Sequence, residues 1–334
     1  MKRRIVTRLV WAIFVVWATV TVAFLVNNAL PTDAARMIAG QQAPPAAVKK
    51  IREELGLDKP LIVQYGLFLK RLVHVKSAPD GNDKAHQNCG AVGPIHMDLG
   101  RSYQQRRPVI TILEERAPRT FLLAFAASIV QALIGVTAGV IAAARRRTAA
   151  DNAAVGISLL GVSAPTFIIG LGLQWIFAFQ LRLLPIDGYG ETAGDHVLAL
   201  ILPATTLGIF GAAYYTRMVR DEMIGQLGQD YIRTARAKGL SGPAVVVRHA
   251  LRNALMPIVT IFGLEVGTLV GGAVVTESVF RWPGLGSLSV DAMLDRDGPV
   301  IMGCVIVTSV VVVLSTLFVD FAYLALDPRL RRAT

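Results

Sequence analysis

Charged residues are scarce in this sequence, because Asp, Glu, Lys and Arg make up only 17% of its 334 residues. A soluble domain usually carries about a quarter of such residues to cover its core. Hydrophobic residues instead reach 53%, which excludes disordered and low-complexity classes. Cysteine occurs only at Cys89 and Cys304, too few for a disulfide framework or a cysteine-based zinc site. The composition therefore indicates an integral membrane protein with several spans.

Long apolar runs define the membrane-spanning helices that we expect. A bilayer core about 30 Å thick requires about 20 apolar residues of helix. Six stretches meet this requirement: Leu9–Leu30, Thr120–Ala144, Ala153–Leu181, Val197–Tyr215, Pro257–Thr276 and Val300–Leu326. The first stretch is longer than the apolar region of a signal peptide, and no convincing cleavage site follows it. We therefore interpret it as a retained span.

Lys and Arg in the short connections indicate the orientation of these spans. With the N-terminus inside, the inner connections include seven Lys and Arg residues in segment 217–256 alone, whereas the short outer connections hold only Arg182, Arg281 and Arg296. This distribution follows the positive-inside rule. We expect both termini to be cytoplasmic. The net charge of +11 then reflects orientation and does not indicate a nucleic-acid partner.

The six spans and their connections predict four parts of the chain. These are an N-terminal transmembrane helix (1–30), an extracytoplasmic loop subdomain (31–119), a five-helix core (120–326) and a cytoplasmic tail (327–334). In the subdomain, the spacing of Val48, Ile51 and Leu55 predicts an amphipathic helix that ends near Gly56. We expect a second helix over 61–73 and an interfacial helix over 109–115.

A polar, turn-rich segment over 77–93 is expected to be a loop. It contains His86 and Cys89, and His96 follows it closely. A metal or haem site, contact with a binding protein and an inert loop are all conceivable here. The spacing matches no defined site, and we assign no metal ligand.

Segment 217–256, called the basic loop below, is the most informative connection. Asp230 is placed to cap a short helix whose last turn carries Lys238, and Gly239 is expected to end that helix in the left-handed conformation. A second helix, opened by Pro243, is expected over 243–255. Two short helices around a glycine break suit docking to a soluble partner. A solvated loop lying against lipid head groups is the alternative.

The sequence YIRTARAKGL at 231–240 resembles the cytoplasmic coupling loop of binding-protein-dependent ABC importer permeases. The general form of that loop is E-A-A-x-x-x-G. Counting back from Gly239 puts Arg233, Thr234 and Ala235 at its first three positions, and the missing Glu is a departure that resembles the dipeptide and oligopeptide branch. Further segments resemble that branch in the same order: DLGRSY (98–103), LPIDGYG (184–190), ALRNALMP (250–257), GGAVVTESVFRWP (271–283) with GLG (284–286), and LDPR (326–329). The chain is similar to the B-type permease subunits of these importers, the DppB and OppB family.

The resemblance implies an all-α membrane protein of the type I ABC importer permease kind, with six transmembrane helices. It implies half of a translocation pathway for short peptides, beside a homologous C-type permease in the lipid bilayer. An extracytoplasmic binding protein and two ATPase subunits, or one fused ATPase, are the other implied partners. The sequence has no G-x-x-x-x-G-K-[ST] phosphate loop. ATP and Mg²⁺ are therefore expected on the ATPase, while this chain carries no cofactor and is not an enzyme.

Under this resemblance, the basic loop couples the chain to the ATPase. The predicted coupling residues are Asp230, Tyr231, Arg233, Thr234, Ala235, Arg236, Ala237, Lys238, Gly239 and Leu240. Similar permeases carry nickel, haem or sugars, so a substrate other than a peptide is an alternative.

Polar residues inside the expected spans are candidates for the pathway. Glu265 lies in the middle of the fifth span, where an ionisable group is costly and indicates function or a helix partner. Gln131 and Gln174 are weaker candidates, and hydrogen bonding across the bundle is the alternative for all three. A proton-coupled secondary transporter that uses Glu265 and Asp320 is a rival interpretation, and a membrane enzyme or assembly scaffold is another.

Small residues at every fourth position on the fifth span predict a close helix-packing face, including one against the partner permease. These residues are Gly263, Gly267 and Gly271.

Overall fold

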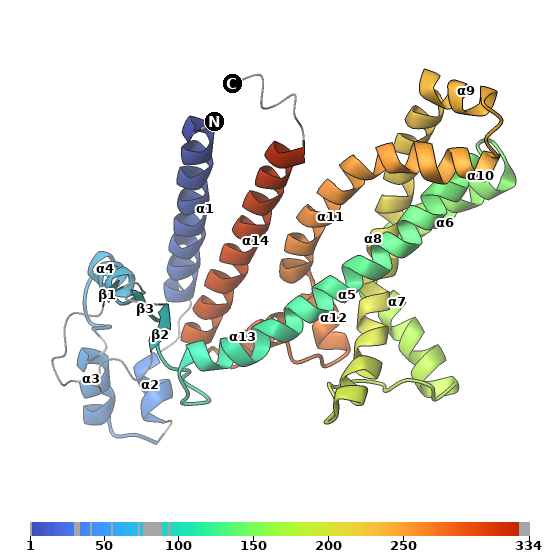
Figure 1. Ribbon diagram of the computed structural model, residues 1–334. Coiled ribbons are helices and arrows are strands. Elements are labelled where there is room, and N and C mark those ends of the chain that lie inside the picture. Colours follow the sequence, from blue (N-terminus) through green and yellow to red (C-terminus); the bar gives the residue numbers. More distant parts are fainter. Residues whose placement is uncertain are drawn as a thin grey trace. The chain divides into compact units, whose positions relative to one another are not determined.

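The computed structural model describes residues 2–29, 34–40, 42–54, 56–72, 74–75, 89–92 and 95–326 (Figure 1). The chain is mostly helical, as predicted. In this part of the chain, four helices are long and apolar enough to cross a membrane: Val6–Asn28, Val109–Ala144, Ala193–Leu227 and Gly298–Phe318. Such runs fold as helices in lipid because a helix satisfies its backbone polar groups internally.

The chain divides into two compact units. The loop unit comprises Lys2–Pro118 and Gly284–Val313, and the core unit comprises Arg119–Pro283 and Leu314–Thr334. The loop unit contains α1 (Lys2–Ala29), α2 (Ala34–Ala39), α3 (Pro45–Glu54), α4 (Leu61–Leu72), β1 (His74–Val75), β2 (Cys89–Val92), β3 (Ile95–Asp98) and α13 (Leu285–Leu294). The core unit contains α6 (Ala149–Ser163), α7 (Thr166–Leu173), the π-helix η2 (Gln174–Gln180), α8 (Ala193–Leu227), α9 (Asp230–Ala237), α10 (Gly242–Ala244), the π-helix η3 (Val245–Leu251), α11 (Arg252–Gly272) and α12 (Val274–Val279). Helices α5 (Val109–Ala144) and α14 (Gly298–Leu326) contribute to both units.

The loop unit buries apolar side chains of α1, α5, α13 and α14 against one another. Phe24 of α1 and Ile112 of α5 belong to this single buried cluster. Helix α14 comes close to α5 at Gly303, where an added Cβ atom would lie 2.6 Å from Cγ1 of Val109. Helix α4 packs on α1 through Phe68, whose ring stacks on that of Phe24 with centroids 5.3 Å apart.

A small antiparallel sheet, in the order β1-β3-β2, lies in the loop unit. Its register pairs His74 with His96 and Cys89 with Asp98. The chain is therefore not strictly all-α, and the loop predicted over 77–93 is wrong at Cys89–Val92. Strands this short leave almost no alternating pattern in a sequence. Helices α3 and α4 confirm the two helices expected here, and Gly56 follows the first with φ of +68°.

In the core unit, α8 contacts α6, α7, α11 and α12. Glycines let α5 approach α8 closely. An added Cβ atom at Gly139 of α5 would lie 2.7 Å from Cβ of Val219, and one at Gly208 of α8 would lie 2.5 Å from Cγ1 of Val130. Small residues on both helices therefore bring their backbones together, as is common in membrane bundles.

The third predicted span, 153–181, is not one helix. Helix α6 ends at Ser163 and α7 begins at Thr166, and the apolar run ends in the π-helix η2. Pro165 is the N-cap residue of α7. Proline has no N–H to donate and disfavours the helical conformation of the preceding residue. The break therefore falls where the sequence places its proline.

The boundaries of three other spans also differ from the predicted ones. Helix α5 runs from Val109 without interruption, so the interfacial helix expected over 109–115 is its beginning. Helices α10, η3 and α11 follow one another without a break, so the helix expected over 243–255 continues through Pro257. Helix α8 extends to Leu227, inside the basic loop. Hydropathy marks only the apolar turns of a helix and misses polar turns at its ends.

Candidate functional site

Helix α9 lies in the basic loop, together with α10 at one end of the core unit (Figure 1). Its N-cap residue is Gln229, so the predicted capping by Asp230 is wrong. Asp230 lies in the first turn, where its charge still favours the N-terminal end of the helix dipole. The helix ends as predicted at Gly239, which has φ of +78°. The Gly239 N–H donates to the carbonyl oxygen of Arg236 at 2.9 Å, as in other glycine-terminated helices.

One face of α9 anchors it to the rest of the core unit. Ile232 is fully buried and Ala235 is 6% exposed. Their cluster contains Tyr215, Val219 and Met223 of α8 together with residues of η3. The spacing of three residues puts Ile232 and Ala235 on the same side of the helix. Helix α9 contacts η3 directly, and the apolar cluster that it shares with η3 and α8 holds it in place.

The opposite face of α9 is open. The other predicted coupling residues are exposed: Asp230, Tyr231, Arg233, Thr234, Arg236, Ala237, Lys238, Gly239 and Leu240. Arg233 lies 3.4 Å from Asp230, but both side chains are largely in solvent. The Tyr231 hydroxyl donates to Oε1 of Gln226 at 2.8 Å. Helix α9 therefore presents an exposed basic surface, while its buried face anchors it to the core unit.

Gln131 of α5, Tyr215 of α8 and Glu265 of α11 form a second group, called the polar cluster below. Gln131 is 1% exposed and Tyr215 is fully buried. Within the described residues, neither the Gln131 amide nor the Tyr215 hydroxyl makes a hydrogen bond of normal geometry. Both side chains nevertheless interact electrostatically with Glu265. Because buried polar groups are rarely left unsatisfied, this cluster is a candidate site within the helical core.

Gln174 is engaged elsewhere. Its Nε2 donates to the carbonyl oxygen of Ile186 at 2.8 Å and to that of Val279 at 3.5 Å. These bonds hold the 184–190 segment against η2 and α12. The structure therefore brings Gln131 and Glu265 together and gives Gln174 different partners.

The three glycines predicted to form a packing face lie on α11 in different surroundings. Gly267 is buried, and an added Cβ atom there would lie 2.5 Å from Cβ of Ser315 on α14. Gly263 is half-buried and Gly271 is exposed. At Gly267, the helix that approaches closely belongs to this same chain.

An ion pair that sequence reasoning missed joins α6 to α8. The Arg220 guanidinium donates to Oδ1 of Asp151 at 2.5 Å and to Oδ2 at 3.0 Å. The Arg147 N–H also donates to this carboxylate, at 2.9 Å. The Arg220 hydrogen bonds, followed by that of Arg147, lower the pKa of Asp151 to about 2. Asp151 lies outside the predicted spans and Arg220 lies within the basic loop, so this pair joins α6 to the part of α8 that the loop contains. No local motif predicts this ion pair, because its partners are 69 positions apart in the sequence.

Two segments noted for their resemblance, 184–190 and 271–283, meet at the start of the core unit. The Arg119 guanidinium lies 4.6 Å from the centroid of the Tyr189 ring. That ring also packs edge-on against Trp282, with centroids 4.9 Å apart. The buried Glu277 accepts a hydrogen bond from the Thr120 hydroxyl at 2.7 Å. These contacts join the beginning of α5 to α12 and to the 184–190 segment.

Among the described residues, no group of three or more His, Cys, Asp or Glu side chains is placed to hold a metal ion. His86 lies outside the described residues. Cys89 and His96 lie on β2 and β3, and Asp320 lies on α14.

Long apolar helices, a basic helical projection and a buried polar cluster define this chain as a membrane-embedded permease subunit. Residues 135–332 match the family model of the binding-protein-dependent transport system inner membrane component, and residues 1–124 match the model of its N-terminal region. The chain belongs to this family, which confirms the resemblance found in its motifs. It is accordingly a permease subunit of an ABC transporter and not an enzyme.

Relatives match the chain over nearly its full length. It is 36% identical over 347 aligned positions to the probable D,D-dipeptide transport system permease protein DdpB of Escherichia coli. The alignment covers 96% of each chain. It is 38% identical over 334 residues to a putative peptide transport system permease protein of Brucella abortus, covering 99% of each. It is 36% identical over 331 residues to the glutathione transport system permease protein GsiC of Escherichia coli, covering 99% of each.

The fold also resembles that of solved transporters. Two inward-facing structures of the MetNI methionine ABC transporter align with TM-scores of 0.53 and 0.55 at 21% identity. Each alignment covers 66% of this chain and 98% of the solved chain. At this identity the likeness concerns the fold alone.

Proposed function

We propose that this chain is the permease subunit of an ATP-driven importer of short peptides, and that it forms half of the translocation pathway. The names of its relatives, which transport D,D-dipeptides, other peptides and glutathione, support a peptide substrate. The other half of the pathway is a homologous C-type permease. Two ATPase subunits or one fused ATPase bind ATP and Mg²⁺, and an extracytoplasmic binding protein delivers the peptide.

The single observation that carries this proposal is the anchored, basic surface of α9. Ile232 anchors the helix in the apolar cluster that it shares with η3 and α8, while Arg233, Arg236 and Lys238 are exposed. A force applied to α9 is therefore transmitted through η3 to α8, which packs against most of the core unit. Closure of an ATPase dimer against this surface moves the helices between inward-open and outward-open states.

The same function requires a definite topology. We propose six spans in the bacterial inner membrane with both termini cytoplasmic, so that the basic loop faces the ATPase. The proposed parts are the N-terminal helix (1–30), the extracytoplasmic subdomain (31–119), the five-helix core (120–326) and the cytoplasmic tail (327–334). The distribution of Lys and Arg supports this orientation.

The proposed pathway is lined by Glu265 and Gln131, and we add Tyr215 because it belongs to the same polar cluster. The carboxylate of Glu265 suits the ammonium group of a passing peptide. Gln174 is the third proposed lining residue, and its Nε2 donates to the backbone carbonyl oxygens of Ile186 and Val279. Gly267 serves close packing against α14, and we propose that Gly263 and Gly271 serve close packing against the partner permease.

Charge reversal on α9 tests this function. Arg236→Glu is introduced into the full chain, which is reconstituted with its partners in proteoliposomes, and uptake of a labelled dipeptide is measured with and without ATP. A like-charge contact at an interface costs several kcal/mol, and about 1.4 kcal/mol already corresponds to a tenfold change. We expect ATP-dependent uptake to fall by about tenfold or more.

Arg145→Glu is the matched control, because Arg145 is also exposed and follows α5 outside the basic loop. It should retain uptake. Wild-type activity in Arg236→Glu, or equal losses in the two variants, contradicts coupling through α9. Uptake driven by a proton gradient without ATP, and lost in Glu265→Gln, favours the proton-coupled alternative that uses Glu265 and Asp320.

A further inference from the structure

A pocket in the loop unit carries side chains of both charges. Its volume is about 460 Å³, within the usual range of roughly 300–1,000 Å³ for small-molecule sites. Its walls come from α2, α4, β3, the turn that follows β3, and the start of α14. We call it the arginine pocket after Arg71, Arg101 and Arg106, which line it with Asp98 and Tyr103. Neither the basic loop nor the polar cluster belongs to it.

The wall formed by residues 98–108 is preorganised. Oδ1 of Asp98 accepts a hydrogen bond from the Gly100 N–H at 2.8 Å, and Gly100 has φ of +79°. Glycine is required there because other residues rarely adopt this conformation. The Arg101 guanidinium donates to the carbonyl oxygen of Arg106 at 2.7 Å, which closes the turn.

Asp297, at the start of α14, fixes the same turn from behind. Its carboxylate is 3% exposed. It accepts hydrogen bonds from the Ser102 hydroxyl at 2.5 Å, the Tyr103 N–H at 3.1 Å and the Gln104 N–H at 3.3 Å. A pocket whose wall is already held in place loses little entropy when a ligand binds.

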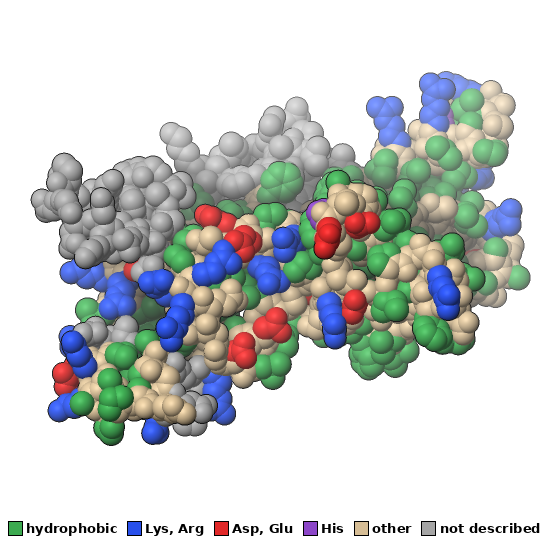
Figure 2. All heavy atoms as spheres, turned by 90° about the horizontal axis from the view of Figure 1, so that it is seen from below, with side chains coloured by type: hydrophobic (Ala, Val, Ile, Leu, Met, Phe, Trp, Pro, Cys, Tyr) green, Lys and Arg blue, Asp and Glu red, His purple; other side chains and the backbone are tan. Residues whose placement is uncertain are grey.

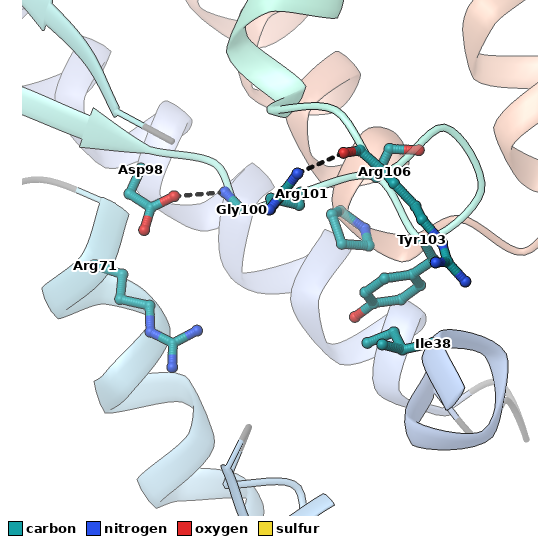
Figure 3. A pocket seen from close by; sticks show the side chains of 9 residues that line it. Ile38, Arg71, Asp98, Gly100, Arg101, Tyr103 and Arg106 are labelled. Carbon is teal, nitrogen blue, oxygen red and sulfur yellow. Dashed lines mark hydrogen bonds between the residues drawn. The ribbon is translucent and has the colours of Figure 1, made fainter. Parts of the chain in front are cut away.

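Polar groups of Arg71, Asp98 and Tyr103 lie around one space in the pocket. In Figure 3 the Arg71 guanidinium and the Tyr103 hydroxyl point toward each other across the pocket, and the Asp98 carboxylate lies on the Arg71 side. Burial is the main cause that raises the pKa of Tyr103, so its hydroxyl remains a donor at neutral pH. Among the described residues, none forms a hydrogen bond with that hydroxyl.

The charges select a class of ligand. Among the described residues that line the pocket, three arginines outnumber the single aspartate. A planar guanidinium fork matches the two oxygens of a carboxylate, and such charged hydrogen bonds are about twice as strong as neutral ones. The nearby acid suits an ammonium group. Charged side chains of both signs also lie close together on the molecular face shown in Figure 2.

We propose that the arginine pocket binds a short zwitterionic peptide, with its C-terminal carboxylate between Arg71 and Tyr103 and its ammonium group toward Asp98. This inference rests on the proposed function, because it adds a second peptide site to an importer. The pocket lies in the proposed extracytoplasmic subdomain.

Direct binding to the full chain in lipid nanodiscs tests the pocket. Isothermal titration is carried out with L-alanyl-L-alanine, with its C-terminal amide, and with acetate. We expect the amide to bind about tenfold more weakly than the dipeptide, which corresponds to about 1.4 kcal/mol for loss of the carboxylate contacts. Acetate should also bind at least tenfold more weakly, because it lacks the ammonium group. Arg71→Gln and Tyr103→Phe should each weaken dipeptide binding, and the second variant keeps the buried ring.

Lys70→Gln is the matched control, because Lys70 is the exposed neighbour of Arg71 on α4 and does not line the pocket. It should bind the dipeptide as the wild type does. Equal affinities for the dipeptide and its amide would overturn the proposal that the pocket binds a peptide. Unchanged dipeptide binding in both Arg71→Gln and Tyr103→Phe would overturn it as well. If acetate binds as tightly as the dipeptide, the pocket does not select a zwitterionic peptide and is only a general anion site. If the chain binds no dipeptide but still supports ATP-dependent uptake, the pocket proposal is refuted and the proposed function stands. If the wild-type complex shows no uptake, the proposed function itself is refuted.

Discussion

A single methyl group at Gly139 tests the close approach of α5 and α8. The Cβ atom of Gly139→Ala would lie 2.7 Å from Cβ of Val219 and 2.8 Å from the carbonyl oxygen of Thr216. Carbon atoms in contact are normally about 3.5–4.0 Å apart, so the helices must separate by about 1 Å. Overpacking of this kind costs about 1–3 kcal/mol. Because α5 and α8 carry two residues of the polar cluster, the same change displaces Gln131 and Tyr215.

Gly156→Ala on α6 supplies the comparison. A Cβ atom at Gly156 would meet nothing within 4 Å. Both substitutions gain the roughly 0.5–1 kcal/mol that alanine contributes over glycine in a helix, so their difference isolates the packing cost. The assay is the midpoint temperature of thermal unfolding in nanodiscs at one scan rate. We expect Gly139→Ala to unfold below the wild type and Gly156→Ala at or above it. Equal midpoints for the two variants would refute the close approach.

Three further perturbations follow from the same structure. Ile232→Ala removes a fully buried side chain, at a cost of about 2–5 kcal/mol, and should make α9 sensitive to limited proteolysis, whereas the exposed Arg233→Ala should not; equal cleavage contradicts the anchoring role. Gly239→Ala puts a side chain at φ of +78°, at a cost of about 1–2 kcal/mol, and should speed amide hydrogen exchange at the end of α9; unchanged exchange argues against the glycine termination. The pKa of Asp151 lies at about 2, below its ordinary value of 3.8. Its contribution to stability is therefore complete above the ordinary pKa and is lost as the pH falls through the folded value. Asp151→Asn should flatten the pH dependence of the unfolding midpoint over this acidic window, and a profile identical to that of the wild type excludes the pair with Arg220.

Hydropathy predicts the long helices well but not where they begin and end. Helix α1 and helix α14 carry long apolar runs, and both form as expected. The break at Pro165 has a cause in the sequence, yet the apolar run continues across it and hides it. The last turns of α8 include Met223, which is buried in the same apolar cluster as Ile232 of α9. A polar turn that becomes helical through tertiary contacts leaves no local pattern to read.

The basic loop was readable because its information is local. Gly239 ends α9 through its own backbone freedom, which requires no distant partner. The polar cluster differs, because Tyr215 becomes part of it only when α5 and α11 come beside α8. Glu265 could be identified alone from the cost of a charge within a span, but its partners could not. Spacing along a helix names the candidates for a buried site, whereas packing decides which of them meet.

The glycines show where that limit lies. Gly135 and Gly139 on α5 have the same four-residue spacing as Gly263, Gly267 and Gly271 on α11, and the sequence singled out only the second group. In the structure, an added Cβ atom would be crowded at both α5 positions, while Gly271 is exposed. A small residue permits close approach but does not supply the helix that approaches. That helix is α8, whose Thr216 and Val219 face Gly139 although they come 77 and 80 positions after it in the chain. Comparing Gly139→Ala with Gly156→Ala therefore tests the close approach of α5 and α8, which the sequence of neither helix alone predicts.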